Sequence, residues 1–408
     1  MGSHTVKILV LGAGAIGSVV GTLLAKRSEV DRLVVADRNL DAARALASKM
    51  DRGRVEAVRI DAGDGSAMAR AFEGLDLVIN VVLPRFNLKI MDACLQAQVS
   101  YMDAATDLAL GTEKPGDPIK APPESLQLAY DARFKAAGIT GLLGMGADPG
   151  LTNLMARMGA DRLDTLDEVL VRDGDNGTVE GYEYASLWSP DTLIEEVLMP
   201  ALAFHDGRFV RLGSLQGEEV FDFPSVGRLT VYNVDHEETN TLPLFLGKGL
   251  RKMDFKIALP KELAEALRVF QRFGLHRGMP IDVEVKATGE TVKVAPRDVL
   301  TALMPNPRDI ATKVRGTGCL AVVVRGTKAG RKDGWMFWAV LDHQETIRRH
   351  GFNAISYPVG APLAMAALML GRGELARKGV FPVEDLDPAP FLRHLPGFGI
   401  MIQEKRLV

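Results

Sequence analysis

The chain has 408 residues, of which 47% are hydrophobic and 25% charged, and its 49 basic and 52 acidic residues give a formal charge of −3. This length exceeds what one hydrophobic core of ordinary size accommodates, so we expect more than one domain. The near balance of charge, without a basic block, argues against a nucleic acid or a membrane surface as partner, because both are bound through clustered positive charge.

The first third of the chain alternates short apolar runs with helical patterns. Strands are predicted at residues 6–11, 33–36, 55–60 and 77–82, and helices at 16–26, 40–50 and 66–72. Such β-α-β-α alternation indicates an α/β domain, with a parallel sheet doubly wound by helices as in the Rossmann fold. An exposed proline-rich loop at Gly111–Glu124, a helix at 125–137 and a strand at 141–143 complete this domain, which we place at residues 5–150.

The pattern changes near residue 165. Partial alternation predicts strands at 169–172, 208–212, 228–232, 252–259, 282–287 and 319–325, with helices at 190–203 and 260–272 between them. Another strand, Gly334–Leu341, follows the turn residues Lys332-Asp333-Gly334 and is predicted to pair as a hairpin. Residues 151–350 are therefore predicted to form a central α+β domain with a mixed, mainly antiparallel sheet. A helix at 362–371 and a coil-rich tail form a C-terminal segment, 351–408.

Cysteine content and hydropathy indicate where the protein resides. The two cysteines, Cys94 and Cys319, are too few for a disulfide framework and predict a reducing compartment. The apolar stretch at residues 355–370 is interrupted by prolines and is too short for a membrane span. Residues 5–11 are apolar but lack the layout of a cleavable signal. We expect a cytoplasmic protein.

A glycine-rich motif, Gly12-Ala13-Gly14-Ala15-Ile16-Gly17, lies between the first predicted strand and the first predicted helix. In this context Gly12 allows a tight turn, Gly14 lets the backbone approach a pyrophosphate, and Gly17 lets helix and strand pack closely. The helix that opens at Ala15 and Ile16 offers free amides and partial positive charge to the phosphates. The motif predicts that a nicotinamide dinucleotide binds here.

The acidic residue that should end the second strand is Asp37, 20 residues after Gly17 (37 − 17 = 20). Its carboxylate can accept both adenosine-ribose hydroxyls and would repel a 2′-phosphate, which favours NAD. Arg38 follows directly and could instead meet that phosphate, so NADP stays open. Asp61, after the third strand, is placed either to contact the adenine or to cap a turn. Asn80 and Val81 end the fourth strand, at the sheet edge that faces the cofactor.

Motifs along nearly the whole chain resemble those of the saccharopine dehydrogenase family, and within it the lysine 6-dehydrogenase-like branch. Besides the glycine motif they are Asp61-Ala62-Gly63-Asp64, Val78-Ile79-Asn80-Val81-Val82, Tyr101-Met102-Asp103, Gly146-Ala147-Asp148-Pro149-Gly150-Leu151-Thr152-Asn153, Thr241-Leu242-Pro243, Val294-Ala295-Pro296-Arg297-Asp298, Gly371-Arg372-Gly373 and Lys378-Gly379-Val380-Phe381-Pro382. The resemblance implies a bilobal homodimer, in which the C-terminal segment returns to the Rossmann domain and the central domain shapes the substrate pocket and the dimer interface. It also implies redox chemistry at a C–N bond of a small amino-acid substrate.

Amine oxidation requires control of protons. A lysine-like ammonium has a pKa of about 10.4 and must become neutral before it can lose hydride, so the site needs a base. Asp103, in the Tyr-x-Asp position of the family, is the first candidate, with helix capping or ion pairing as the structural alternative. His236 is the second, because an imidazole exchanges protons near neutrality, although a histidine without a catalytic role is an equal alternative.

Several other residues are candidates for binding the substrate. Asp148 and Asn153 lie in a predicted turn that leads into a helix, where free amides could hold a carboxylate and where capping is the alternative. Arg85 could bind a carboxylate and Tyr184 could line the pocket, with a structural role as the alternative for each. Glu238 could bind a distal amino group, with a solvated side chain as the alternative. The histidines and cysteines show no metal-ligand spacing, so no metal is expected.

Three functions remain open from the sequence. The first is oxidative deamination of an amine such as that of the lysine side chain, with hydride passing to the nicotinamide and the imine then hydrolysed. The second is reduction of an imine between an amine and a carbonyl compound, as in saccharopine or carboxynorspermidine dehydrogenases. The third is a non-catalytic protein that senses NAD(P).

Overall fold

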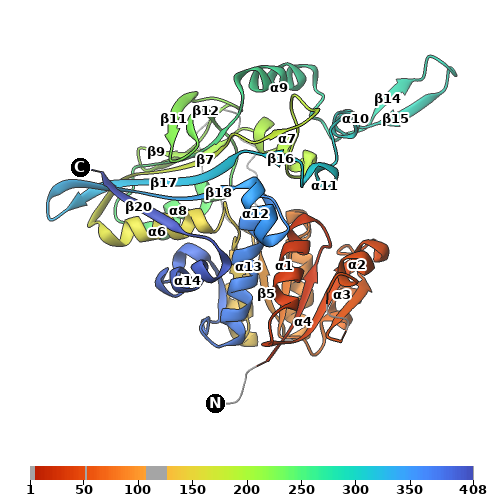
Figure 1. The fold of residues 1–408 in the computed structure, drawn as a ribbon, viewed down its shortest axis with the longest axis horizontal. Coiled ribbons are helices and arrows are strands. Elements are labelled where there is room, and N and C mark those ends of the chain that lie inside the picture. The colour runs from red at the N-terminus through yellow and green to blue at the C-terminus, as the bar shows by residue number, and fades with distance from the viewer. Residues whose placement is uncertain (1–4, 51–52, 107–125, 408) are drawn as a thin grey trace.

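The computed structural model describes residues 5–50, 53–106 and 126–407, so the predicted Gly111–Glu124 loop lies outside the described residues. Figure 1 shows two lobes, with the N-terminal third in the lower one and the middle of the chain in the upper one. The lower lobe is a parallel α/β domain and the upper lobe is built on a larger, mostly antiparallel sheet. The fold class expected from the sequence is confirmed.

The Rossmann domain contains seven parallel strands in the order β19-β6-β5-β4-β1-β2-β3. They are β1 (Val6–Leu11), β2 (Val30–Asp37), β3 (Val55–Arg59), β4 (Leu77–Asn80), β5 (Ser100–Asp103), β6 (Thr140–Leu143) and β19 (Gly379–Pro382). The strand order reverses at β1 and β4, so a crevice opens beyond their carboxyl ends, where such sheets bind ligands. Val81 and Val82, predicted as strand, follow the end of β4.

Helices cover both faces of this sheet. They are α1 (Ala15–Ala25), α2 (Leu40–Ala47), α3 (Gly65–Phe72), α4 (Asn87–Ala97), α5 (Asp131–Ala137) and α13 (Ser356–Gly371), with short 3₁₀ turns η1 (Pro84–Phe86) and η2 (Leu128–Tyr130). A Cβ on Gly360 would lie 2.6 Å from the Cβ of Val19, so the glycine lets α13 pack closely on α1. The helix predicted at 362–371 begins six residues earlier, at Ser356. Proline disfavours a helix in a sequence pattern, but packing of this buried helix compensates for the prolines that it contains.

The C-terminal segment is not coil-rich as predicted. After α13 it contributes β19 to the Rossmann sheet, then η3 (Val383–Asp385), α14 (Ala389–His394), η4 (Leu395–Phe398) and β20 (Ile402–Leu407). Strand β20 pairs with the central sheet, so the segment joins both lobes. Its charged sequence resembles coil, but charged side chains are typical of an edge strand. Arg406 of β20 pairs with Asp333 in this position.

The central sheet runs β10-β9-β13-β7-β17-β18-β20, with the β11–β12 hairpin also beside β13. Its strands are β7 (Thr165–Asp175), β9 (Leu202–His205), β10 (Arg208–Arg211), β11 (Glu219–Phe223), β12 (Gly227–Asn233), β13 (Lys252–Ala258), β17 (Thr317–Lys328), β18 (Arg331–Asp342) and β20. Among the described strands of this sheet, only the neighbours β13 and β7 run parallel to each other. The prediction of a mixed, mainly antiparallel sheet is confirmed.

The turn between β17 and β18 lies at Ala329-Gly330 and not at the predicted Lys332-Asp333-Gly334. Both turn residues have positive φ, 49° and 73°, as a two-residue hairpin turn requires. Gly334 instead lies within β18, opposite Arg325. The turn was missed because alanine at its first position is a weak turn signal.

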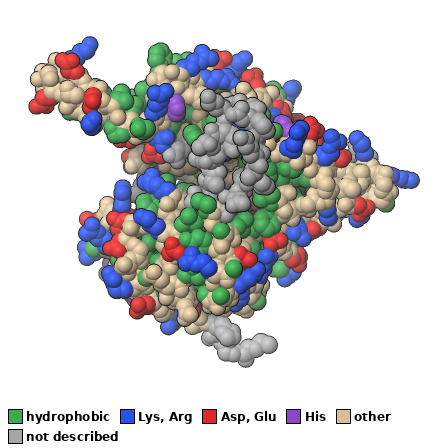
Figure 2. Space-filling model, turned by 180° about the vertical axis from the view of Figure 1, so that it is seen from behind, with side chains coloured by type: hydrophobic (Ala, Val, Ile, Leu, Met, Phe, Trp, Pro, Cys, Tyr) green, Lys and Arg blue, Asp and Glu red, His purple; other side chains and the backbone are tan. Residues whose placement is uncertain are grey.

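Helices α6 (Leu151–Arg162) and α8 (Glu238–Leu246) pack side by side against one face of the central sheet. The predicted helix at 190–203 ends early, as α7 (Pro190–Leu198), before Pro200. The remaining elements are β8 (Thr178–Val179), α9 (Lys261–Phe273), β14 (Ile281–Glu284), β15 (Thr291–Val294), α10 (Pro296–Leu303), α11 (Pro307–Ile310), β16 (Val314–Arg315) and α12 (His343–His350). The β14–β15 hairpin projects from the body as an arm (Figures 1 and 2).

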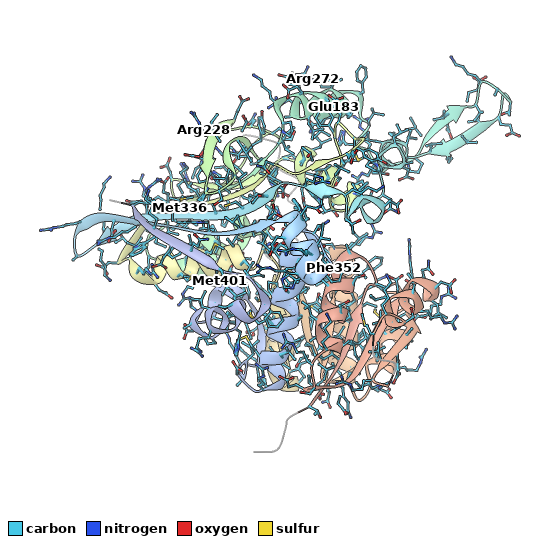
Figure 3. The ribbon with its side chains drawn as sticks, viewed as in Figure 1. Glu183, Arg228, Arg272, Met336, Phe352 and Met401 are labelled. Carbon is cyan, nitrogen blue, oxygen red and sulfur yellow. The ribbon has the colours of Figure 1, made fainter. Side chains whose placement is uncertain are left out.

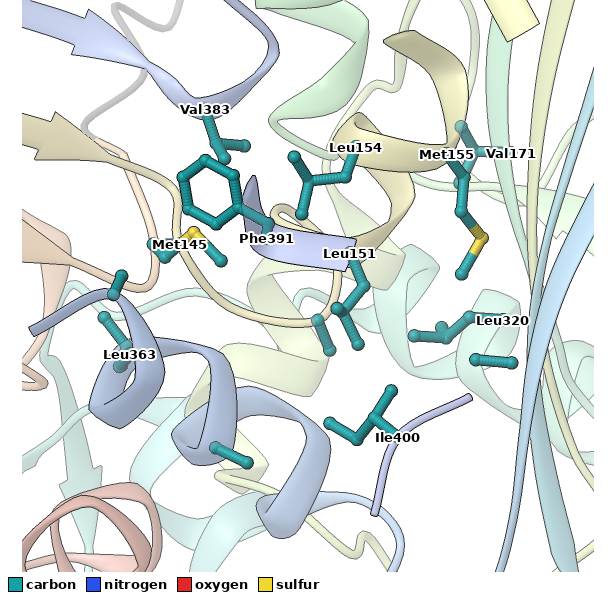
Figure 4. Close-up of a cluster of buried hydrophobic side chains, with 14 of the residues drawn as sticks. Met145, Leu151, Leu154, Met155, Val171, Leu320, Leu363, Val383, Phe391 and Ile400 are labelled. Carbon is teal, nitrogen blue, oxygen red and sulfur yellow. The ribbon is translucent and has the colours of Figure 1, made fainter. Parts of the chain in front are cut away.

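One apolar core runs through both lobes. In Figure 4, Met145 after β6 and Leu363 of α13 lie near Leu151 of α6, and Leu320 of β17 lies on the sheet side of the cluster. This continuity fixes the carboxyl edge of the Rossmann sheet against the central domain. Both cysteines are free and buried, in agreement with the expectation of no disulfide. No helix of the described chain is long and apolar enough to cross a membrane.

Candidate active site

The glycine loop has the steric form that a dinucleotide requires. Gly12 has φ of 115°, and a Cβ there would lie 3.0 Å from the carbonyl oxygen of Val81. A Cβ on Gly17 would lie 1.8 Å from the carbonyl oxygen of Gly12, so only glycine allows α1 to pack this close. A Cβ on Gly14 would meet nothing within 4 Å, because that side of the loop is open. Gly14 is thus the point at which a pyrophosphate can approach the backbone.

Asp37 is held in place at the end of β2. Its Oδ2 accepts a hydrogen bond from the amide of Ala13 at 2.9 Å, and its Oδ1 accepts one from the amide of Asn39, also at 2.9 Å. The carboxylate is therefore fixed beside the glycine loop, and each oxygen keeps a lone pair for a ribose hydroxyl. Arg38, the next residue, is exposed. At the start of α1, Ala15 is exposed and Ile16 is half-buried.

Asp61 and Asn80 both have structural contacts, although Asp61 is also exposed. Asp61 accepts a hydrogen bond from the amide of Gly63 at 2.8 Å, so it caps the turn after β3. The buried Asn80 side chain points inward, where its Nδ2 donates to Asn87 and to the hydroxyl of Tyr101. Asn80 ends β4 as predicted, but its side chain is engaged within the protein, so only its backbone can face a cofactor at the sheet edge.

Asp103 is the centre of a buried polar network. Its side chain is 1% exposed and accepts three hydrogen bonds, from the Tyr101 hydroxyl at 2.8 Å, Gln127 Nε2 at 2.7 Å and the Gly144 amide at 2.7 Å. Burial raises the pKa of Asp103 to about 6, although these three donors oppose the shift. Because its oxygens face protein donors, the geometry supports a positioning role that ties β5 to β6. Gln127 could not be found from the sequence, since it is distant along the chain.

His236 lies buried between β12 and α8. Its ring stacks on Phe255 with centroids 3.8 Å apart, and its Nδ1 lies 2.5 Å from Glu238 Oε2 and 3.5 Å from Glu237 Oε2. Burial alone lowers the pKa of His236, but the carboxylates of Glu238, Glu237 and Asp148 raise it well above its usual value. His236 is therefore held as an imidazolium near neutral pH.

Glu238 connects this imidazolium to the Rossmann side of the site. It is 0% exposed, and its Oε1 accepts a hydrogen bond from the hydroxyl of Thr152 at 2.7 Å. Thr152 belongs to the first turn of α6. This turn follows the segment that contains Asp148 and that leads away from β6 of the Rossmann sheet. Asn153 in the same turn accepts a hydrogen bond from the amide of Gly150, so it caps the helix.

Further carboxylates converge on the same point. The carboxyl groups of Asp148 and Asp173 are hydrogen-bonded to each other, and burial and mutual repulsion raise the pKa of Asp148 well above its usual range. Burial raises the pKa of Asp173 to about 7, with Asp175 adding to the shift. Burial likewise raises the pKa of Glu237 to about 8. The acid cluster, as we call it, consists of Asp148, Asp173, Glu196, Glu237 and Glu238 around His236.

Sequence reasoning missed Asp173, Glu196 and Glu384. Asp173 lies inside β7 and Glu196 inside α7, where no motif marks them. Glu384 follows β19 and is fully buried beside Asn153 and Thr241, yet among the described residues neither of its oxygens receives a well-formed hydrogen bond. Burial raises the pKa of Glu384 to about 7. Only the tertiary fold brings these residues to the carboxyl edge of the Rossmann sheet.

Comparison with known proteins agrees with this geometry. Residues 8–142 match the family model for the saccharopine dehydrogenase NADP binding domain, and residues 146–400 match the model for the saccharopine dehydrogenase C-terminal domain. The chain belongs to the saccharopine dehydrogenase family. Like the rest of the family it is an oxidoreductase that depends on NAD or NADP. The family prediction is therefore confirmed.

Two relatives cover nearly the whole chain. Carboxynorspermidine synthase of Vibrio cholerae is 30% identical over 410 residues, covering 96% of this chain and 95% of the relative. Carboxyaminopropylagmatine dehydrogenase of Synechocystis is 30% identical over 400 residues, covering 97% and 96%.

Solved structures share the fold at lower identity. Saccharopine dehydrogenase (L-Glu forming) from Saccharomyces cerevisiae has a TM-score of 0.73 at 17% identity, over 99% of this chain and 100% of that one. Homospermidine synthase from Legionella pneumophila, solved with NAD, has a TM-score of 0.67 at 16% identity, over 98% and 91%.

Two predicted pocket residues of this family member lie apart from the acid cluster. Arg85, on η1 after β4, is exposed and its guanidinium lies over the ring of Phe86. Arg85 therefore lies at the carboxyl edge of the Rossmann sheet, where the cofactor is expected to bind. Tyr184 is 38% exposed and lies near Glu183 and Glu262, the latter at the start of α9. Its place in the substrate pocket stays a prediction.

The sequence predicted no metal-ligand spacing, yet potential ligand atoms of His236, Glu237 and Glu238 lie within 4.8 Å of one another. The 2.5 Å contact between His236 and Glu238 is an ion pair and is too close for a metal between the two atoms, since each metal–ligand bond measures about 2.0 Å. The absence of a metal stays a prediction.

Proposed function

We propose that this enzyme reduces an imine formed between a diamine and an amino acid that carries an aldehyde. The observation that carries the proposal is the acid cluster, in which five carboxyl residues surround a single imidazolium at the carboxyl edge of the Rossmann sheet. Gathering so many partly or fully buried carboxyl groups costs free energy unless they are protonated or cations offset their charge. A diamine supplies those cations, one ammonium remaining after the other nitrogen has formed the imine.

The names of the relatives support the same chemistry. Carboxynorspermidine and carboxyaminopropylagmatine both denote a polyamine that bears a carboxyl group. Joining an amine to an amino-acid aldehyde and reducing the C=N bond gives a product of this kind. The relatives thus favour imine reduction over the oxidative deamination that the sequence placed first. Their names also describe catalysts, which disfavours a non-catalytic NAD(P) sensor.

The cofactor supplies hydride to the imine carbon, and the imine nitrogen takes a proton, so one C–N double bond becomes a secondary amine. Asp148 and Asp173 share a proton at their facing carboxyl oxygens and are poised to release it near neutral pH. The carboxylates of the acid cluster bind the remaining ammonium, while Thr152 and the imidazolium of His236 keep Glu238 in position among them. Arg85, at the end of β4, is the candidate for the carboxylate of the amino acid.

We also propose NAD as the preferred cofactor, since Asp37 is fixed where a 2′-phosphate would lie. The family model is described as NADP binding, and the exposed Arg38 offers a way to accept the phosphate, so both cofactors must be assayed. A homodimer is the proposed assembly. Partly exposed apolar side chains on one face of the central sheet, including Phe221, Met336 and Trp338, support it. Light scattering after gel filtration measures the mass directly.

A diamine and a monoamine of equal carbon number test the proposed function. Each is mixed with an amino-acid aldehyde, and oxidation of NADH or NADPH is followed by absorbance. We expect the diamine to have a KM at least about tenfold lower, because only it places an ammonium in the acid cluster. Equal KM values for the two amines would show that the acid cluster does not bind the substrate. Oxidation of lysine with NAD, without imine reduction, would restore the deamination hypothesis.

A further inference from the structure

An open cavity lies on the outer side of the central domain. It measures about 520 Å³ and is lined by residues 213–218, which join β10 to β11, together with Pro200 and one side of α9. Figure 3 labels Arg272 of this cavity at the top of the molecule, away from the Rossmann lobe. None of the acid-cluster residues lines it. Its volume suits a small metabolite.

Two arginines give the cavity its charge. Arg268 and Arg272 are one turn apart on α9, and neither forms an ion pair within the described chain. The Arg268 guanidinium donates one hydrogen bond to the carbonyl of Leu215 at 2.8 Å and lies 5.4 Å from the ring centre of Tyr232. Its other donors remain free. Paired guanidinium groups are the side chains best suited to carboxylate or phosphate oxygens.

Behind the cavity wall lies a buried polar group. Tyr232 is fully buried, and within the described chain its hydroxyl forms no well-formed hydrogen bond. It lies between Arg268 and Glu218, which both line the cavity. The Asn233 Oδ1 next to it is buried and unpaired as well. Unsatisfied buried polar atoms are rare in native proteins and often indicate a site for a ligand.

We propose that this cavity binds a small molecule carrying a carboxylate or phosphate group, which Arg268 and Arg272 hold, and that the ligand regulates the enzyme through α7. Gln271, on the cavity wall, donates to the carbonyl of Leu198 at the end of α7 at 2.6 Å. It also exchanges hydrogen bonds with Ser214. A ligand that competes for Gln271 therefore acts on the end of α7.

Helix α7 extends from this cavity to the acid cluster. Glu196, two residues before Leu198, belongs to the cluster, and its carbonyl accepts a hydrogen bond from the amide of Asp235, next to His236. Displacement of α7 would move a carboxylate of the amine site. The binding claim stands by itself, whereas the effect on the amine rests on the proposed function.

The test measures binding separately from catalysis. Citrate and inorganic phosphate are titrated calorimetrically into the cofactor-saturated enzyme at constant ionic strength in chloride. We expect saturable binding of at least one, and the pair tells whether a carboxylate or a phosphate is preferred. Arg268→Gln/Arg272→Gln should weaken it at least about tenfold. Arg208→Gln/Arg228→Gln, which removes two exposed arginines outside the cavity, should not change it.

Several outcomes overturn the proposal. Binding of neither probe, or equal binding by the cavity and control variants, excludes this site. Arg272→Glu alone guards against misfolding, because Arg272 is exposed and its charge reversal should still abolish binding. Binding that leaves the KM of the diamine unchanged refutes regulation through α7. If no amine is a substrate, the calorimetry still decides the binding claim.

Discussion

Removing the charge of Glu238 tests the electrostatics of the acid cluster. Glu238→Gln keeps the size of the side chain and can still accept from Thr152, but it cannot neutralise His236. Breaking a buried ion pair by deleting one partner costs about 3–5 kcal/mol. The buried imidazolium can release its proton once Glu238 is replaced, so we expect the lower part of this range.

The same substitution should move the pKa of His236. In the native enzyme this pKa is raised, so its contribution to stability is fully present below the unfolded value of about 6.5 and is lost as pH rises through the folded pKa. Replacing Glu238 removes the largest effect that raises the pKa of His236. Burial of the ring, which lowers this pKa, then counts for more, so the pKa of His236 in the folded enzyme falls. The stability difference between native enzyme and variant should therefore be fully present below both folded pKa values, and it should shrink as pH rises from the folded pKa of the variant to that of the native enzyme.

NMR titration of the His236 ring, together with denaturation by urea across the same pH range, measures both effects. Glu237→Gln is the matched control: its carboxyl has a pKa of about 8 and is largely protonated at neutral pH, so the amide replaces an already neutral group. We expect small changes in the control. An unchanged pKa of His236 in Glu238→Gln, or equal losses in both variants, would refute the assigned ion pair.

Three further predictions concern the Rossmann domain. Asp37→Ser should shift the ratio of kcat/KM values toward NADP at least about tenfold, and an unchanged ratio would exclude Asp37 from cofactor choice. Asp103→Asn should destabilise the protein by about 1–3 kcal/mol, because an amide cannot accept all three hydrogen bonds; a loss of turnover with unchanged urea stability would instead make Asp103 catalytic. Gly17→Ala should lower both stability and cofactor affinity, since its Cβ would meet Gly12, whereas Gly14→Ala should lower only affinity; equal thermal shifts would contradict this reading of the loop.

Local sequence patterns predicted the Rossmann domain well because its strands are buried on both faces. Continuous apolar runs such as residues 6–11 and the glycine motif carry their information within a short window. The C-terminal strands β19 and β20 escaped prediction for the opposite reason. The first is a four-residue strand at the edge of the sheet, and half of the residues of the second are charged.

The active site was predictable only in part. His236 and Glu238 adjoin a family motif, and Asp148 belongs to another, so the sequence could single them out. Asp173 and Glu196 come from the interior of a strand and a helix, and nothing local distinguishes them from surface acids. Their place in the active site depends on packing between parts of the chain that are far apart in the sequence. The same holds for Asp103, whose partner Gln127 shows that its carboxylate is enclosed.

Transfer of deuterium tests the central claim most directly. The enzyme is supplied with a diamine, an amino-acid aldehyde and reduced cofactor that carries deuterium at the transferable position, and the product is analysed by mass spectrometry. The account predicts a secondary amine with one deuterium on the former imine carbon. Deuterium lost to a free alcohol, or no product while lysine is oxidatively deaminated, would contradict it.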